Sequence, residues 1–252
     1  MNMARDVNPI PIVRIIEKLD YYFAKNDVDG AERHLDYWLK EAENGNDKRG
    51  KLSILNEQIG LFRKKGNMND AFSAVSEATE LLKELRMEDT VTGGMVYLNA
   101  GTAFNAFGLP DEAIGFYQKA ERIFDGNLTH YDKRMGGLYN NAALAYSAVC
   151  DYDKAIEFFG KALKVMEHNK GCEPESAITY LNLADLYDAC EDSGKVNDCL
   201  LKAKELLFLG NVVPDGNYAF VCEKCAPVFA KYGDGETERE LLLRAKRIYE
   251  GN

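Results

Sequence analysis

The sequence repeats itself with a period of 40 to 42 residues. An aromatic column holds Tyr22, Phe62, Phe104, Tyr146, Tyr187 and Phe229, whose successive spacings are 40, 42, 42, 41 and 42 residues. A column of mostly small residues keeps the same spacings and holds Ala31, Ala71, Ala113, Ala155, Val196 and Glu238. A single unit of this length cannot bury its own apolar face, so neighbouring units must stack on it.

Each period contains two segments in which apolar residues recur at helical spacing. The clearest pair runs from Tyr139 to Tyr146 and from Asp151 to Leu163, with a short polar turn between the segments. Small residues at Ala143 and Ala155 let two helices approach closely. Alternation typical of strands is limited to a few residues. The sequence therefore predicts an all-α fold of about six helix pairs, in one repeat domain covering residues 1–252. The predicted units lie near 12–51, 52–93, 94–135, 136–176, 177–218 and 219–252.

The sixth unit departs from the pattern at two positions. Pro227 falls in the middle of a predicted helix, where it removes a backbone hydrogen bond and crowds the preceding turn. Glu238 stands where the other units carry a small residue that allows close helix contact. We therefore expect an irregular last pair, with an interruption at Pro227.

These columns resemble the tetratricopeptide repeat family. The residues that carry the resemblance are the Tyr-x-x-Ala-Ala-x-x-Tyr motif at 139–146 and the Ala-x-x-x-Phe-x-x-Ala motif at 155–162. The usual repeat has about 34 residues, so the longer period is similar to the extended repeats of kinesin light chains, of the Leu-Gly-Asn-repeat polarity adaptor and of bacterial peptide-pheromone receptors. The resemblance implies a right-handed α-α superhelix whose first helices line a concave, peptide-binding surface.

Asparagine recurs in one column of the predicted first helices, at Asn99, Asn141 and Asn182. The resemblance implies that such amides grip the backbone of a bound peptide. An amide offers donors and an acceptor, so the same residues are equally suited to bonding the neighbouring helix pair. Both readings remain open for the column. The groove predicted around it adds Leu98, Asn140, Leu181, Ile178 and Asp185, of which the apolar residues are alternatively core between repeats.

Charge constrains the partner. The formal net charge is -10, with no basic run longer than Arg63, Lys64 and Lys65. Nucleic acids and anionic membranes require clustered cations, so neither is expected as a partner. The expected partner is a protein or an extended peptide that is basic or apolar rather than acidic. Residues 1–11 show no apolar signal core, and no apolar run reaches the length of a membrane span, so we expect a cytoplasmic protein.

No residue pattern predicts catalysis, a cofactor or a metal site. Cys222 and Cys225 form a lone Cys-x-x-Cys pair, and zinc needs two more ligands. Buried reduced thiols are the expected state of this pair, since cytoplasmic proteins rarely carry disulfides. The three histidines, His34, His130 and His168, join no nucleophile or acid in a recognisable set. The chain is therefore expected not to be an enzyme.

Two functions fit the sequence. The first is a scaffold that binds a peptide or partner protein in a concave groove. The alternative is a regulatory peptide sensor of the pheromone-receptor type that lacks its effector domain, since only about a dozen residues precede the first predicted helix.

Overall fold

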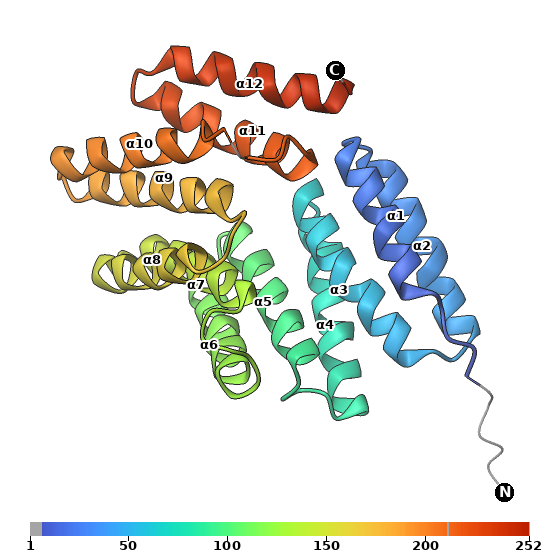
Figure 1. Ribbon diagram of the computed structural model, residues 1–252. Coiled ribbons are helices and arrows are strands. Elements are labelled where there is room, and N and C mark those ends of the chain that lie inside the picture. Colours follow the sequence, from blue (N-terminus) through green and yellow to red (C-terminus); the bar gives the residue numbers. More distant parts are fainter. Residues whose placement is uncertain (1–6, 211, 252) are drawn as a thin grey trace, which may run out of the picture. The chain divides into compact units, whose positions relative to one another are not determined.

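The computed structural model describes residues 7–210 and 212–251, which form twelve helices and no strand (Figure 1). The chain divides into two compact units, residues 1–128 and 129–252, each containing six of these helices. The helices of the first unit are α1 (Ile12–Ala24), α2 (Val28–Asn44), α3 (Lys48–Lys65), α4 (Met68–Leu85), α5 (Val91–Ala106) and α6 (Pro110–Asn127). Those of the second unit are α7 (Lys133–Ala148), α8 (Tyr152–Glu167), α9 (Glu173–Ala189), α10 (Ser193–Leu207), α11 (Gly216–Lys231) and α12 (Gly235–Glu250).

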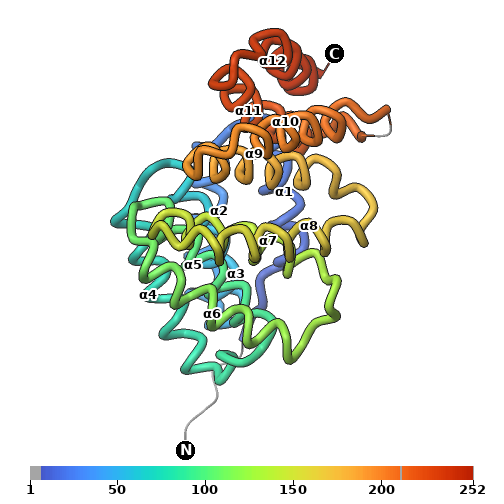
Figure 2. Tube along the Cα trace, turned by 90° about the vertical axis from the view of Figure 1, so that its left-hand side faces the viewer, coloured from blue at the N-terminus to red at the C-terminus, as the bar shows by residue number. Residues whose placement is uncertain are grey.

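Within each unit, consecutive helices form three pairs that stack one on the next. In the first unit, α3 contacts both its partner α4 and the first helix of the following pair, α5. In the second unit, α9 contacts its partner α10 and the neighbouring first helices α7 and α11. The same succession of pairs can be followed along the Cα trace in Figure 2. The predicted fold class, an α-solenoid of six helix pairs, is confirmed.

The predicted boundary at residue 12 coincides with the start of α1, whereas the later boundaries lie a few residues inside the first helix of each pair. The second unit was expected to begin near residue 52, whereas α3 begins at Lys48, and the fifth near 177, whereas α9 begins at Glu173. The repeat columns mark the buried face of each helix rather than its capping residue, which explains the offset. Division into a single repeat domain of residues 1–252 stays a prediction.

Aspartate and asparagine side chains begin most of the second helices. Asp27, Asn67, Asp151, Asp192 and Asp234 each accept a hydrogen bond from the backbone N–H three residues further on. These bonds satisfy amide groups that have no partner inside the helix. The small-residue column lies at the contact within each pair, where Ala31, Ala71, Ala113 and Ala155 are fully buried. The local sequence therefore fixes where a helix starts, and the column fixes which face it buries.

The sixth pair differs from the sequence-based expectation. No interruption occurs at Pro227, since α11 continues through it as one helix, and that expectation is wrong. Pro227 lies on the exposed side of α11, where the carbonyl that loses its bond can face water.

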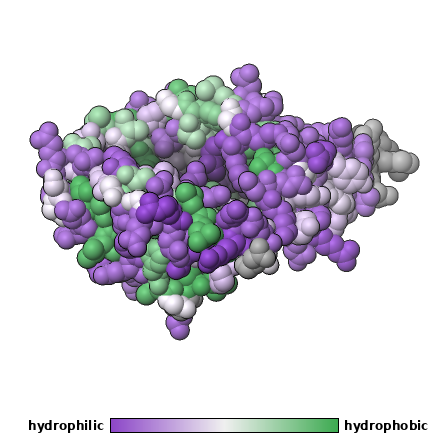
Figure 3. Space-filling model, turned by 90° about the horizontal axis from the view of Figure 1, so that it is seen from above, coloured by the Kyte–Doolittle hydropathy of each residue, from purple (hydrophilic) through white to green (hydrophobic). Residues whose placement is uncertain are grey.

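The irregularity lies in α12 instead. Its buried residues are Thr237, Leu241 and Ala245, so the buried stripe begins one residue before Glu238. Leu242 stands at the repeat spacing after five apolar residues of the other second helices, Leu35, Val75, Tyr117, Phe159 and Leu200, but it is 45% exposed. Rotation of the helix keeps the charged Glu238 out of the close contact. Figure 3, which looks down on the side where α12 lies, shows apolar side chains in patches among polar ones.

The cap of α12 should make stability depend on pH. The Asp234 carboxylate accepts bonds from Lys204 Nζ at 2.8 Å and from Thr237 N at 3.0 Å and Oγ1 at 2.7 Å. These donors lower the pKa of Asp234 to about 2. A lowered folded-state pKa stabilises the protein above the unfolded pKa of about 4, and this stabilisation is lost as pH falls towards about 2.

We expect Asp234→Ala to lower the free energy of unfolding by about 1 kcal/mol at neutral pH, in line with the loss of a helix cap. The difference from the wild type should vanish near pH 2, as measured by urea unfolding at a series of pH values. Asp234→Asn keeps the capping oxygen but cannot titrate, so its pH profile should be flatter. Parallel profiles for the wild type and Asp234→Asn would contradict this account.

Candidate functional site

An amide pair joins the first helices of two consecutive pairs in the first unit. Asn99 on α5 donates from Nδ2 to Asn56 Oδ1 on α3 at 3.0 Å. Asn56 Nδ2 in turn lies 3.5 Å from Glu57 Oε1. All three side chains are half-buried. The structure therefore gives Asn99 the contact expected of an amide that bonds the neighbouring pair, and still leaves it in partial contact with solvent.

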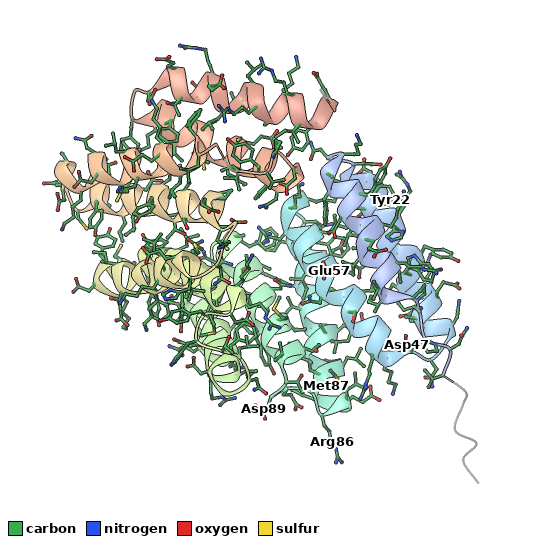
Figure 4. The ribbon with its side chains drawn as sticks, viewed as in Figure 1. Tyr22, Asp47, Glu57, Arg86, Met87 and Asp89 are labelled. Atoms are coloured by element: carbon green, nitrogen blue, oxygen red, sulfur yellow. The ribbon has the colours of Figure 1, made fainter. Side chains whose placement is uncertain are left out.

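Two carboxylates, Glu57 and its neighbour Asp20, lie beside this amide pair. Burial raises the pKa of Glu57, the bond from Asn56 opposes that rise, and the charge of Asp20 on α1 adds to it. Figure 4 labels Glu57 on α3. Within the described part of the chain, Glu17, Asp20 and Glu57 form no ion pair. A cation from a ligand would relieve the repulsion between Glu57 and Asp20.

A hydroxyl pair between α5 and α6 and a guanidinium on α3 extend this group of polar side chains into a strip. Tyr117 Oη lies 3.5 Å from Thr102 Oγ1, which itself bonds the carbonyl of Leu98 at 2.9 Å. Burial raises the pKa of Tyr117 to about 12. The charge of Arg63 on α3 interacts with the Tyr117 hydroxyl, and burial lowers the pKa of the Arg63 guanidinium. The strip thus carries an acidic part near Glu57 and a cation at Arg63, about two turns further along α3.

The second unit contains an equivalent amide pair. Asn182 on α9 donates from Nδ2 to Asn140 Oδ1 on α7 at 3.2 Å. Thr179 Oγ1 donates to the same oxygen at 3.0 Å. In the repeat, Asn140 stands one unit after Leu98 and two units after Asn56. Asn182 stands one unit after Asn141. The same connection between first helices therefore recurs in both units.

Not all predicted groove residues are accessible. Leu98 is 7% exposed and Leu181 is 2% exposed, so both lie in the core between helices, as the alternative reading held. Ile178 is half-buried and packs against the core of the second unit. Asn141 is half-buried in the same column as Asn99 and Asn182. Apart from the half-buried Ile178, the accessible part of the predicted groove is therefore polar.

Asp185 carries a counterion that the sequence analysis did not identify. Its Oδ1 accepts bonds from Lys231 Nζ at 2.8 Å and from Tyr232 Oη at 3.0 Å. Lys231 also lies 3.1 Å from Asp188. The bonds that Lys231 donates to Asp185 and Tyr232 raise the pKa of its ammonium. Lys231 is more than one repeat away from Asp185 in sequence, and no repeat column links the two residues, so the pairing was not visible before folding.

Asn56 and Glu57 were also missed as site residues. Asn56 shares a column with Asn140, at two repeat lengths, and Glu57 shares the column of Asn99. Reading both columns together would have found the amide pairs. The sequence analysis followed a single column, because a bond between adjacent columns requires knowledge of how consecutive helices are offset.

All six cysteines are free thiols. Cys222 and Cys225 are buried, and burial raises their pKa values to about 11 and about 12. Among the described residues, no group of three or more His, Cys, Asp or Glu side chains is arranged to hold a metal ion. The Cys-x-x-Cys pair therefore packs as small apolar side chains do.

We expect thiol reagents to distinguish two classes of cysteine in the folded protein. Cys150 and Cys190 are exposed and should react within minutes with a disulfide reagent such as dithiobis-nitrobenzoate. Cys172, Cys199, Cys222 and Cys225 are buried and should react only after unfolding. Mass spectrometry of the labelled protein identifies the sites. Rapid labelling of Cys225 without urea would contradict this arrangement.

In the described residues, no helix is both long and apolar enough to span a membrane. Residues 134–207 match the tetratricopeptide repeat family. No curated protein matches the sequence.

Solved structures share the fold at low sequence identity. BtubC (BKLC) from P. vanneervenii has a TM-score of 0.55 and 21% identity, over 96% of this chain and 92% of that chain. A putative kinesin light chain from Podosopora anserina with nearly identical TPR-like repeats has a TM-score of 0.56 and 15% identity, over 80% of this chain and 96% of that chain. NprR in complex with its cognate peptide NprX has a TM-score of 0.62 and 19% identity, over 94% of this chain and 68% of that chain.

Proposed function

Because this chain is built of tetratricopeptide-like repeats, we propose that it is a protein-interaction scaffold that binds an extended peptide or partner segment. It acts by binding and carries out no reaction. The binding surface is the first-helix face, which we define separately for each unit. In the first unit it comprises Asp20, Asn56, Glu57 and Asn99, and in the second unit Asn140, Asn141 and Asn182.

The observation that supports this surface most strongly is the repeated amide pair. Asn99 and Asn182 each use one N–H in the bond to the preceding first helix. Their second N–H and their Oδ1 have no partner among the described residues. An extended peptide offers one carbonyl and one N–H at each residue, which these groups match. The bond to the preceding helix also holds the amide in place, so less freedom is lost on binding.

Charge indicates which peptides bind. The first unit presents Asp20 and Glu57 without counterions, so its face favours lysine or arginine side chains. In the second unit Asp185 is already paired with Lys231 and adds no such preference. The expected ligand is basic where it meets the first unit and neutral or apolar elsewhere. A cytoplasmic location for this binding stays a prediction.

A regulatory peptide sensor is the second candidate. Its support is the fold shared with NprR, whose solved structure contains a bound peptide. A scaffold should keep its dimensions when a peptide binds, whereas a sensor should change curvature. Small-angle X-ray scattering of the chain with and without a selected peptide separates the two candidates.

A displayed library of random linear peptides provides the test of binding. Peptides enriched on the immobilised protein should contain lysine or arginine, and their dissociation constants are measured by isothermal titration calorimetry. Glu57→Gln should raise the dissociation constant by about two- to fivefold, the effect of one partly solvated charge. Asn99→Ala should also weaken binding, by roughly fivefold for one net hydrogen bond.

Glu112→Gln is the matched control, because Glu112 is an exposed acid on the second helix α6 and the charge change is the same. Circular dichroism confirms that each variant is folded at the temperature of the titration. If Glu57→Gln and Glu112→Gln weaken binding equally, the effect comes from the net charge of the protein and not from the position of Glu57. Wild-type binding by both Glu57→Gln and Asn99→Ala would exclude the first-helix face of the first unit.

A further inference from the structure

A cavity of about 250 Å³ lies in the second unit, at the amino-terminal ends of α7 and α9. Lys133 and Gly137 of α7 form one side, and Val165 and Met166 of α8 form the apolar wall. The other side is closed by Asn169, Gly171, Cys172 and Glu175. The volume is below the roughly 300 to 1,000 Å³ of sites for drug-sized ligands. The cavity therefore has room for one side chain or one small polar molecule.

One carboxylate oxygen of the lining residue Glu175 has no hydrogen-bond partner among the described residues. Glu175 Oε1 accepts a bond from Asn217 Nδ2 on α11 at 2.9 Å. Glu175 Oε2 is buried and accepts no bond from any described residue. An unsatisfied buried acceptor destabilises a protein, and each such group in a folded protein calls for an explanation. A donor supplied by a ligand would satisfy Oε2.

The lining also contains one cation. The Lys133 ammonium lies close enough to Cys172 to oppose the rise that burial causes in the pKa of that thiol. Lys133 forms no ion pair with Glu175 or with any other described carboxylate. The lining thus carries one positive and one negative charge that do not neutralise each other directly. A cationic ligand would meet Lys133, and an anionic ligand would meet Glu175.

A neutral group with both a donor and an acceptor fits this lining best. We infer that the cavity binds a primary carboxamide, such as the side chain of a glutamine or asparagine residue in a bound peptide. The carboxamide N–H donates to Glu175 Oε2, and its carbonyl oxygen accepts from Lys133 Nζ. The methylene groups of the side chain pack against Val165 and Met166.

The position of the cavity agrees with the proposed peptide surface. Lys133 and Glu175 each precede an amide of the second unit's pair, Asn140 and Asn182, by seven residues. Seven residues correspond to about two turns, roughly 10 Å along each helix. That distance equals about three residues of extended peptide. The assignment to a peptide side chain rests on the proposed function, whereas binding of the free carboxamide does not.

Three blocked amino acids serve as probes: the N-acetyl, N-methylamide derivatives of glutamine, glutamate and lysine. Each is titrated into isotopically labelled protein, and amide chemical shifts are followed by NMR. The glutamine probe should shift the amide signals of Gly137, Gly171 and Cys172 with a dissociation constant on the order of 10 mM, as expected for so small a ligand. The glutamate and lysine probes should bind at least about fivefold more weakly, because each meets a like charge.

Two variants test the cavity directly. A Cβ on Gly137 would meet no atom within 4 Å, so Gly137→Leu should fold and fill the cavity, abolishing the shifts. Gly160→Leu on α8 is the control, since a Cβ there also meets open space but Gly160 does not line the cavity. Glu175→Gln should weaken the glutamine probe by about fivefold through loss of the charged acceptor.

Saturable shifts that disappear in Gly137→Leu and persist in Gly160→Leu would support the inference. Absence of saturable shifts at about 100 mM glutamine probe would overturn it. Equal or tighter binding of the glutamate or lysine probe, or unchanged binding by Glu175→Gln, would overturn the carboxamide assignment. If no peptide binds the chain but the free glutamine probe does, the proposed function fails while the site remains.

Discussion

Replacement of Leu241 by alanine is expected to lower the free energy of unfolding by about 2 to 5 kcal/mol, the range for deleting a buried leucine side chain. Leu241 is fully buried between α11 and α12, in the core of the second unit that also contains Phe229 and Ala245. The lost contacts and the cavity left behind both contribute. Urea unfolding followed by circular dichroism measures the change.

Leu242→Ala is the matched control, because the same atoms are removed from the neighbouring position. Leu242 is 45% exposed, so its loss should cost less than about 1 kcal/mol. The repeat column alone predicts the opposite order, with Leu242 as the buried residue. A larger loss in Leu242→Ala than in Leu241→Ala would restore the register read from the sequence and refute the rotation of α12.

Gly94→Ala is expected to destabilise the protein by about 1 to 3 kcal/mol, the usual cost of overpacking. A Cβ on Gly94 of α5 would overlap Cε1 of Phe124 and lie 2.8 Å from its Cδ1, and the Phe124 ring is fully buried. Alanine normally stabilises a helix relative to glycine by about 1 kcal/mol, so steric overlap must outweigh that gain.

The equivalent glycine of the next repeat should behave differently. Gly136 of α7 stands 42 residues after Gly94, and Met166 stands 42 residues after Phe124. A Cβ on Gly136 would lie 3.4 Å from Val165 Cγ1 and 3.6 Å from Met166 Cγ, which is ordinary contact. Gly136→Ala should therefore leave the thermal midpoint unchanged or raise it. Equal destabilisation by the two substitutions would show that the ring of Phe124 does not set the difference.

The asparagine column shows which features of the candidate site could be predicted from the sequence. Equal spacing of Asn99, Asn141 and Asn182 was enough to place one amide on each of three successive first helices. It could not show that Asn99 bonds Asn56 or that Asn182 bonds Asn140, because those bonds join different columns. It also could not separate the buried Leu98 and Leu181 from accessible neighbours, since both kinds of position lie on the first helix.

The sequence by itself determined the period, the number of helix pairs and the residues of close contact within a pair. These features are local or repeat at a fixed spacing, so periodicity records them directly. Tertiary structure alone decided the rotation of α12, the pairing of Asp185 with Lys231 and the cavity beside Glu175. Each of these depends on how residues from different helices meet. Packing selects that arrangement by excluding overlap and unpaired charge, and no single helix carries the information.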